Sequence, residues 1–350
     1  MNLERIAGIF AENFERRGEV GAAVSVWKNG VEILSLVDGF ADRARTIPWT
    51  QTTPVLIWSA GKGPAAACVL RAAKEAALSL GTKMAEFWPQ FAQAGKANVT
   101  IGQAMSHQAG VAALDADVSV LESEAVIAAL ERQAPNWPLG TGHGYHPRTF
   151  GFLMDEIVCR LTGRSLAEYW QQFFAEPLGF DFWFGTPPDV FVAEMLPPKS
   201  MGRESEKEFY AALATPGSLT ARAFRSPHGL ARAAEMNSAE VRSRSLPAFG
   251  AIATASSLAK YYATLDLEVE TITSGFDKVL QMETAFGAGF MKSAKFFGPS
   301  PRAFGHPGAG GSLGFADPEN QIAFAYVMNQ MAPGVMPNEN SLLMVAALYE

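Results

Sequence analysis

The sequence predicts an α+β protein: one antiparallel sheet built from both ends of the chain and flanked by helices, with a mainly helical segment inserted between them. Residues 21–39 and 312–331 each contain two β-rich runs joined by a turn. Residues 81–245 read instead as helices and loops. Because a lone hairpin is only marginally stable in water, the two hairpins are expected to pair in one sheet.

The first elements are marked by amphipathicity and by a turn. MNLERIAGIFAENFERR places apolar and charged residues on opposite helical faces, which predicts an amphipathic surface helix. The following segment, GAAVSVWKNGVEILSLVDG, carries Asn29-Gly30 between two β-rich runs, and Asn-Gly is the strongest short signal for a hairpin. Residues 59–80 then read as an Ala-rich helix. Its start lies near Ser59–Gly63, because Pro64 is tolerated only in a first turn.

Helices separated by Pro- and Gly-rich loops fill the middle of the chain, and strands return near its end. Residues 312–331 read as a strand, a DPEN turn and a strand, and a closing helix is expected over Asn340–Tyr349. Ser165 and Glu168 form a capping box at the start of one helix. That helix is expected over Ser165–Phe174, and further helices are expected over Glu122–Gln133, Thr149–Thr162 and Ser256–Leu265.

The chain of 350 residues is long enough for two interleaved domains. Residues 1–80 together with 246–350 are expected to form the sheet domain, and residues 81–245 the mainly helical domain, with the active site in the cleft between them. The hydrophobic content of 48% and the charged content of 18% are typical of a globular protein.

Charge and hydropathy argue against several classes of partner. The net charge is −7 and there is no basic run, which disfavours nucleic acid and acidic membranes. No apolar stretch reaches the length that spans a bilayer, and the N-terminal segment lacks the apolar core of a signal peptide, so a cytoplasmic location and no membrane partner are expected. Cys68 and Cys159 lie in apolar helical contexts and are expected to be buried thiols without a disulfide.

The start of the helix over residues 59–80 is a candidate catalytic site. Ser59 and Lys62 are three residues apart, a spacing that places both side chains on one helical face. A lysine near a helix N-terminus opposes the macrodipole, and the apolar flanks favour its neutral form, which is a base. A serine beside a base is an activated nucleophile. The alternative is an N-cap serine followed by a solvated lysine.

Tyr145 is a second candidate, in a Gly-rich loop just before a predicted helix. An exposed tyrosine can act as a general base where cations lower its pKa, and the alternative is a tyrosine that packs the end of the loop. His143 and His146 form an H-x-x-H pair that could bind a metal together with His107. No carboxylate or cysteine lies at a matching spacing, so no metal or other cofactor is expected.

Ser312 is the rival nucleophile, because Gly310–Gly314 matches G-x-S-x-G. That motif requires a strand before the serine, a helix after it and a histidine further along the chain. Here a Gly-rich loop precedes Ser312, a predicted strand follows it, and the last histidine is His306. Ser312 is therefore expected to be a strand residue and not the nucleophile.

Three motifs together resemble those of a known family. Ser59–Lys62, Tyr145–Pro147 and His306–Gly308 fall in the order and rough spacing of S-x-x-K, Y-x-N and K/H-x-G. This pattern resembles the serine β-lactamase-like hydrolases, which include class C β-lactamases, DD-peptidases and, most similar to this chain, family VIII carboxylesterases. The segments VTIGQAMSHQAGV, LTGRSLAEYWQQFFAEPLGF and PAFGAIATASSLAKYY also resemble the family, so the likeness spans nearly the whole chain and implies its fold.

The resemblance assigns a role to each motif. It implies that Ser59 is the acylated nucleophile, that Lys62 is the base or tunes the base, and that Tyr145 shares the proton transfer. It places His306–Gly308 on the strand that lines the pocket. The oxyanion hole would be formed by the main-chain N–H groups of Ser59 and Ala309.

Departures from the motifs indicate the substrate. Pro147 replaces the asparagine that holds a substrate amide in the family, and His306 replaces a lysine that would pair with a carboxylate. Gly61 replaces a larger or hydroxyl residue. These changes favour neutral, short-chain esters with apolar acyl groups. Residues near the motifs that could line such a pocket, or simply pack the core, are Trp58, Trp137, His146, Phe150 and Phe152.

The expected function is therefore a serine hydrolase that cleaves small-molecule carboxylic esters through an acyl-enzyme on Ser59. An acyltransferase or a weak β-lactamase would use the same acyl-enzyme and is the first alternative. A non-catalytic, penicillin-binding-like binding protein is the second. A homo-oligomer is possible for each of these.

Overall fold

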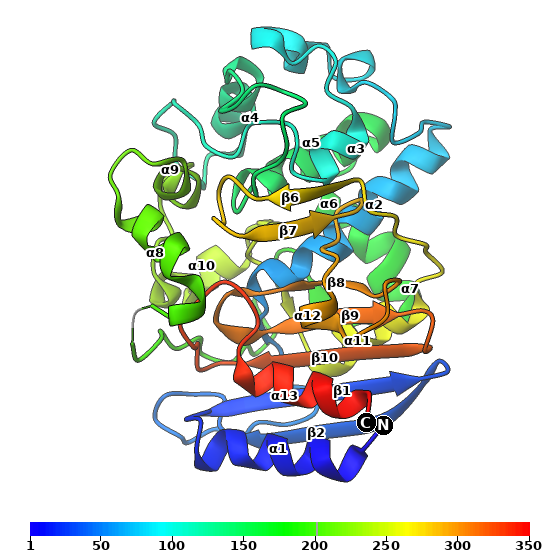
Figure 1. Ribbon diagram of the computed structural model, residues 1–350, viewed down its shortest axis with the longest axis vertical. Coiled ribbons are helices and arrows are strands. Elements are labelled where there is room, and N and C mark those ends of the chain that lie inside the picture. The colour runs from blue at the N-terminus through cyan, green and yellow to red at the C-terminus, as the bar shows by residue number, and fades with distance from the viewer. Residues whose placement is uncertain (201) are drawn as a thin grey trace.

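A five-stranded antiparallel sheet, in the order β2-β1-β10-β9-β8, forms the centre of the computed structural model, which describes residues 1–200 and 202–350 (Figure 1). Its strands are β1 (Gly21–Lys28), β2 (Val31–Gly39), β8 (Phe304–Pro307), β9 (Leu313–Asp317) and β10 (Ile322–Met328). β1 pairs with β10 along its length, from Ala22 opposite Met328 to Lys28 opposite Ile322. The prediction that the sheet is built from both chain ends is confirmed.

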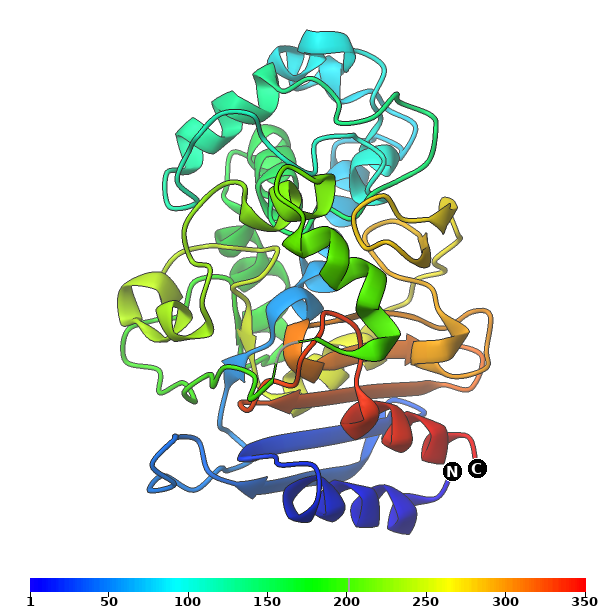
Figure 2. The same ribbon diagram turned by 60° about the vertical axis from the view of Figure 1, so that its left-hand side comes forward.

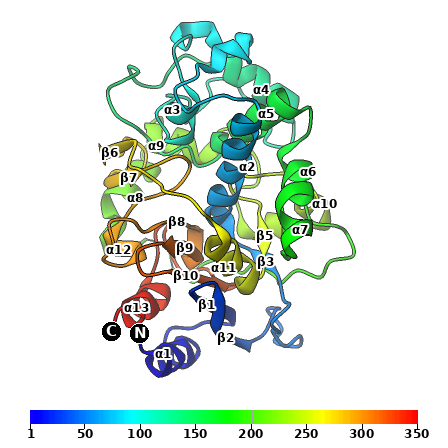
Figure 3. The ribbon, with the colours of Figure 1, turned by 90° about the vertical axis from the view of Figure 1, so that its right-hand side faces the viewer.

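Helices cover the two faces of this sheet. Along β10 the side chains alternate: Phe324 and Tyr326 pack in one core with α1 (Leu3–Glu15) and α13 (Glu339–Leu348), whereas Ala323 and Ala325 face the other core. On that second face α11 (Ala255–Thr264) packs against β1, β9 and β10 (Figure 3). The alternation of large and small side chains follows from the two-residue period of a strand, and the alanines allow α11 to approach closely.

The middle of the chain forms helices and loops beside the sheet, as Figure 2 shows in cyan and green. α2 (Lys62–Glu75) precedes this part of the chain. The helices of the middle are α3 (Ile101–Met105), α4 (Ser123–Arg132), α5 (Thr149–Thr162), α6 (Leu166–Trp170), α7 (Glu176–Leu178), α8 (Lys207–Ala214), α9 (Leu219–Arg225) and α10 (Ala239–Arg242). Shorter helical segments are η1 (Trp58–Gly61), η2 (Met84–Glu86), η3 (Pro89–Gly95), η4 (Gln171–Ala175), η5 (Glu204–Glu206), η6 (Ala233–Asn237) and η7 (Ala309–Gly311), and the remaining helix is α12 (Ala294–Phe297).

Two smaller sheets complete the fold. β3 (Val55–Leu56), β5 (Ile252–Ala253) and β4 (Phe182–Trp183) form a three-stranded sheet, and β3 leads directly into η1. β6 (Thr273–Phe276) and β7 (Glu283–Phe286) form a separate hairpin. The sequence analysis predicted neither of them.

Most predicted helices have nearly the observed bounds, and two predictions need correction. α5 spans the predicted residues, but the helix expected over 59–80 begins as η1 and its α-helical part ends at Glu75, after which Ala77 takes a left-handed φ of 55°. Cys159, expected to be buried, is exposed, while Cys68 is buried and both thiols are free. The division into two domains stays a prediction. Among the described residues, no helix has the length and apolarity needed to cross a membrane.

Glu19 joins the two ends of the chain from the turn between α1 and β1. Its Oε1 accepts hydrogen bonds from Tyr326 Oη (2.5 Å) and from Asn340 Nδ2 (2.6 Å). Its side chain is 4% exposed, and Oε2 has no partner among the described residues. Burial raises the pKa of Glu19 from 4.5 to about 7, although the hydrogen bonds from Tyr326 and Asn340 lower it.

We expect Glu19 to make the stability pH-dependent. Because its pKa is higher in the folded than in the unfolded state, the folded protein binds this proton more tightly, and stability falls as pH rises from about 4.5 to about 7. Glu19→Gln removes the titration. Relative to this variant, the free energy of unfolding of the wild type should fall by roughly 3 kcal/mol between pH 4 and pH 8, measured by urea denaturation. A difference that does not change with pH would contradict the burial argument.

Candidate active site

Ser59 and Lys62 lie where the chain passes from β3 into α2. Ser59 is in η1 and partly exposed, and Lys62 is the first residue of α2. Trp58, just before the serine, has a φ of 51°, a left-handed conformation that is costly for a residue with a side chain and that turns the chain sharply here. As the spacing predicts, Lys62 Nζ lies 3.0 Å from Ser59 Oγ.

Three oxygen atoms surround the Lys62 amine. Besides Ser59 Oγ, Nζ hydrogen-bonds to the main-chain oxygens of Pro147 (3.1 Å) and Ala248 (2.7 Å). Lys62 is fully buried, and within the described residues no carboxylate forms an ion pair with it. Burial lowers the pKa of Lys62 well below its usual range. A neutral amine has two N–H groups, which suit the two carbonyls, and one lone pair, which is left for the hydroxyl of Ser59.

Tyr145 completes this group from the loop before α5. Nζ of Lys62 lies 4.8 Å from the centre of its ring. Burial raises the pKa of Tyr145 above its ordinary value, although a side-chain hydrogen bond with Ser59 lowers it in part. The expectation of an exposed tyrosine with a depressed pKa is wrong, because the ring is 4% exposed and the nearby lysine is itself driven toward the neutral form by burial. Tyr145 therefore holds its proton and can donate it.

Unpaired main-chain N–H groups lie on the two segments beside Ser59. Around η7, the N–H groups of Gly308, Gly310 and Gly311 donate to the main-chain oxygens of Ser312 (2.7 Å), Gly334 (3.1 Å) and Gly308 (3.2 Å) respectively. In the described part of the chain, the N–H groups of Ala309 and Ser59 donate to no protein acceptor. They are free for a ligand oxygen.

Ser312 holds β8 against the segment that carries Ser59. It is buried directly before β9, and its hydroxyl donates to the main-chain oxygen of Ile57 (2.9 Å). Gly308 lies at the same junction, where a Cβ would be 2.2 Å from that oxygen. Gly61 is similarly constrained, since a Cβ there would lie 2.4 Å from the Cβ of Ala251. The glycine in S-x-x-K therefore has a packing reason, whatever the substrate.

His306 on β8 supplies no cation. Its Nδ1–H donates to the main-chain oxygen of Pro307 (2.7 Å), and its Nε2 is buried with no partner among the described residues. Burial lowers the pKa of His306 to about 3. Its ring centre lies 5.8 Å from that of Tyr145, so a neutral imidazole stands beside the tyrosine.

The predicted pocket residues differ in their positions. His146 is buried, with Nδ1 bonded to the main-chain oxygen of Gly144 (2.7 Å) and Nε2 accepting from the N–H of Val111 (3.1 Å), so it holds the loop, and its role as a pocket residue stays a prediction. Trp137 packs edge-on against the His146 ring and is buried as well. Phe150 and Phe152 are buried in the core, whereas Trp58 is partly exposed.

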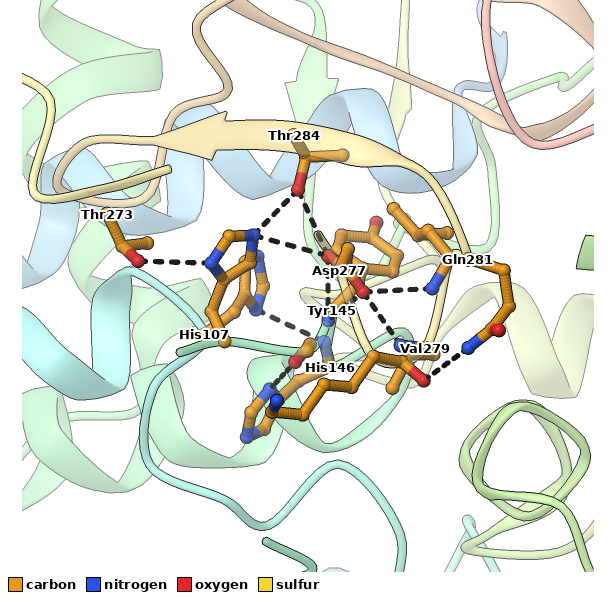
Figure 4. Close-up of polar contacts among 12 residues, drawn as sticks. His107, Tyr145, His146, Thr273, Asp277, Val279, Gln281 and Thr284 are labelled. Carbon is orange, nitrogen blue, oxygen red and sulfur yellow. Dashed lines mark hydrogen bonds and ion pairs between the residues drawn. The ribbon is translucent and has the colours of Figure 1, made fainter. Parts of the chain in front are cut away.

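The histidines near Tyr145 hold the main chain together. His107 Nδ1 accepts from the N–H of His146 (3.2 Å), two residues that Figure 4 labels. His143 bonds through its two ring nitrogens to the hydroxyls of Thr273 and Thr284. Among residues 1–200 and 202–350, no three His, Cys, Asp or Glu side chains are grouped as a metal site would need.

Sequence reasoning missed several groups that shape this site. The carbonyls of Pro147 and Ala248 leave no trace in side-chain motifs. Asp277, in the turn of the β6–β7 hairpin, accepts the N–H of Tyr145 at 3.0 Å from Oδ1 and 3.1 Å from Oδ2 (Figure 4). An aspartate in a turn is common, so only the fold distinguishes this one.

Comparison with known proteins identifies the family. A family model described as Beta-lactamase matches residues 6–348. The chain belongs to the beta-lactamase family. Among curated proteins, this family member is similar to "Esterase/beta-lactamase LipL" of Mycobacterium tuberculosis (strain ATCC 25618 / H37Rv), with 30% identity over 353 residues that cover 93% of this chain and 81% of the relative.

Solved structures give the same assignment. A penicillin-binding protein homologue from Caulobacter crescentus is 33% identical with a TM-score of 0.87, and covers 99% of this chain and 96% of its own. A family VIII carboxylesterase is 30% identical with a TM-score of 0.83 and the same coverage of both chains. EstA from Arthrobacter nitroguajacolicus is 28% identical with a TM-score of 0.85, over 99% of this chain and 95% of its own. The resemblance drawn from the three motifs is confirmed, and this beta-lactamase family member is an enzyme of the esterase and β-lactamase type.

Gly308 gives a test of the junction between β8 and the Ser59 segment. In Gly308→Ala the new Cβ meets a main-chain oxygen that cannot turn away, so we expect the free energy of unfolding to fall by about 1–3 kcal/mol. We also expect the esterase activity per folded molecule to fall, because the shift displaces the segment that carries Ser59. The matched control is Gly8→Ala on the exposed face of α1, where a Cβ meets nothing within 4 Å. Equal behaviour of the two variants in thermal melts and ester turnover would refute the close approach.

Proposed function

We propose that this protein is a serine hydrolase that cleaves carboxylic esters with short, apolar acyl groups through an acyl-enzyme on Ser59. The observation that carries the proposal is the setting of Lys62. This buried amine has two carbonyl acceptors and, among the described residues, no carboxylate partner, so it presents its lone pair to the Ser59 hydroxyl, 3.0 Å away. This is how a lysine activates a serine nucleophile at neutral pH.

The acylation step can be written from these residues. Oγ of Ser59 attacks the ester carbonyl as its proton passes to Lys62 Nζ, and the carbonyl oxygen becomes an oxyanion. The main-chain N–H groups of Ser59 and Ala309 receive this charge, and each such donor contributes about 2.7–4 kcal/mol in comparable sites. The bond to the alkoxide then breaks, Tyr145 gives the alkoxide a proton, and Lys62 returns its proton to Tyr145.

Hydrolysis of the acyl-enzyme repeats the steps with water. Water loses a proton to the Lys62–Tyr145 pair and attacks the acyl carbon, and the bond between that carbon and Oγ of Ser59 breaks. Oγ regains a proton and a carboxylic acid leaves. An alcohol or amine in place of water would give acyl transfer, so the acceptor that reaches the acyl-enzyme decides between the two activities.

The residues at two of the motifs, His306 and Pro147, support a neutral substrate. The neutral His306 offers no charge to a substrate carboxylate, and Pro147 has no side-chain amide for a substrate peptide bond. Each polar group that is buried without a partner costs about 1–3 kcal/mol. Esters without these groups avoid that cost. The names of the relatives, an esterase/beta-lactamase and a family VIII carboxylesterase, agree with ester hydrolysis.

β-Lactam hydrolysis is the second candidate, because the name of the curated relative joins the two activities. A purely binding role is less compatible with the hydrogen bond between Ser59 and Lys62 and with the Tyr145 ring centre 4.8 Å from Lys62 Nζ. We further propose that the substrate enters between the sheet and the helical middle of the chain. The cytoplasmic location and the homo-oligomer stay predictions.

The identity of the nucleophile can be tested directly. Ser59→Ala should abolish ester turnover and labelling by a fluorophosphonate probe, since among the described residues Ser59 alone pairs its hydroxyl with the Lys62 amine. Ser312→Ala should fold and keep most activity, because it loses a single hydrogen bond worth about 1 kcal/mol. Intact mass followed by peptide mapping locates the adduct. An adduct on Ser312 would refute the assignment.

Substrate preference tests the ester proposal. We expect kcat/KM for p-nitrophenyl butyrate to exceed that for nitrocefin by at least tenfold, since nitrocefin carries a carboxylate and an amide that His306 and Pro147 leave unpaired at about 1–3 kcal/mol each. His306→Lys should reduce the ratio of kcat/KM for p-nitrophenyl butyrate to that for nitrocefin, because it places a cation where the substrate carboxylate would lie. Equal values for the two substrates in the wild type would favour a β-lactamase.

A further inference from the structure

Asp277 is a fully buried carboxylate that no role proposed so far uses. It lies in the turn between β6 and β7, and every partner of its two oxygens is a donor. Oδ1 accepts the N–H groups of Tyr145 (3.0 Å), Val279 (2.8 Å) and Leu280 (2.9 Å). Oδ2 accepts the same N–H of Tyr145 (3.1 Å) and the hydroxyl of Thr284 (3.2 Å), as Figure 4 shows.

The loop that carries Tyr145 has little stiffness of its own. Gly140, Gly142 and Gly144 are three of the five residues before it, and the first two have φ values of 81° and 117°. Glycine segments are the most mobile that a chain can form, so the position of Tyr145 depends on contacts from outside the loop. The contact of its own N–H is the one with Asp277.

The hairpin side of this contact is braced by neutral groups. Thr284 gives its single hydroxyl hydrogen to Asp277, so its oxygen must accept from Nε2–H of His143 (2.8 Å). Nδ1 of His143 then accepts from the hydroxyl of Thr273 (3.0 Å). The chain of bonds therefore ties both strands of the hairpin to the loop that carries Tyr145.

We propose that Asp277 is a positioning residue for Tyr145, holding its main chain so that the phenol reaches the leaving alkoxide in the acylation step. The inference rests on the proposed function, in which Tyr145 protonates that alkoxide. The carboxylate is suited to this task because both of its oxygens lie within hydrogen-bond distance of the Tyr145 N–H, and a hydrogen bond to an ionised acceptor is roughly twice as strong as a neutral one. Its negative charge also raises the pKa of Tyr145 and so keeps the proton on the phenol.

Leaving-group dependence separates positioning from folding. p-Nitrophenolate leaves without a proton, whereas ethoxide needs one, and butyrate esters of both give the same acyl-enzyme. The ratio of kcat/KM for ethyl butyrate to that for p-nitrophenyl butyrate therefore reports proton donation and is independent of the amount of folded enzyme. Misplacing a catalytic group by about 1 Å costs about 100-fold.

Asp277→Asn replaces one acceptor oxygen by an amide that cannot accept the Tyr145 N–H. We expect the ratio of kcat/KM for ethyl butyrate to that for p-nitrophenyl butyrate to fall about tenfold or more. This is less than the roughly 100-fold cost of a full displacement by about 1 Å, because one acceptor oxygen remains. Tyr145→Phe should lower it further. The matched control is Asp317→Asn, since Asp317 is also fully buried and accepts from Asn320 and Tyr349 away from the site, and its ratio should equal that of the wild type.

The outcomes distinguish the two claims. If Tyr145→Phe lowers the ratio and Asp277→Asn does not, the positioning role is refuted and the proposed function stands. If Tyr145→Phe itself leaves the ratio unchanged, the proton-donor role of Tyr145 fails. If Asp277→Asn does not fold, Thr284→Val provides the test. This variant removes one donor to Oδ2 of Asp277, and it should lower the ratio by less than the roughly tenfold fall expected for Asp277→Asn. An unchanged ratio in Thr284→Val overturns the inference.

Discussion

The burial of one lysine amine organises this protein. Nζ of Lys62 draws Ser59, the Pro147 carbonyl and the Ala248 carbonyl to a single point, although these groups come from three segments far apart in the sequence. A buried charge without a partner costs several kcal/mol, whereas a neutral amine between two carbonyls does not. The same condition that makes the lysine tolerable in the core therefore makes it a base.

Close main-chain approaches make that arrangement possible. Gly61 lets the segment that carries Ala248 pass beside α2, and Gly308 lets β8 pass beside the segment that carries Ser59. The sheet fixes β8 in turn, since β9 and β10 connect it to β1. The proposed oxyanion donors are main-chain N–H groups, which can be only as well placed as the strands beneath them, so the proposed mechanism depends on the central sheet.

The correct predictions rest on residues that are neighbours in the sequence, and the features that were missed or wrong depend on contacts between distant segments. The bounds of α5 and the two terminal hairpins follow from periodicity and turn residues that lie next to each other in the chain. Ser59 and Lys62 are one turn apart, so their contact could also be predicted. The loop-holding role of His146, the raised pKa of Tyr145 and the contact with Asp277 depend on burial by segments that are distant in sequence. Side-chain patterns contain no information about such neighbours.

Pairing β1 with β10 has a consequence for how this chain is made. Gly21 and Asn329, which are hydrogen-bonded beside these strands, are 308 residues apart in sequence. At roughly 5–20 residues per second, a ribosome needs roughly 15 to 60 seconds to synthesise the intervening chain. During that time the first hairpin has emerged, but its partner strand does not yet exist. Until then the apolar face of the first hairpin has no partner, so the nascent protein is a natural client for holding chaperones, and the last strands to leave the ribosome complete the sheet.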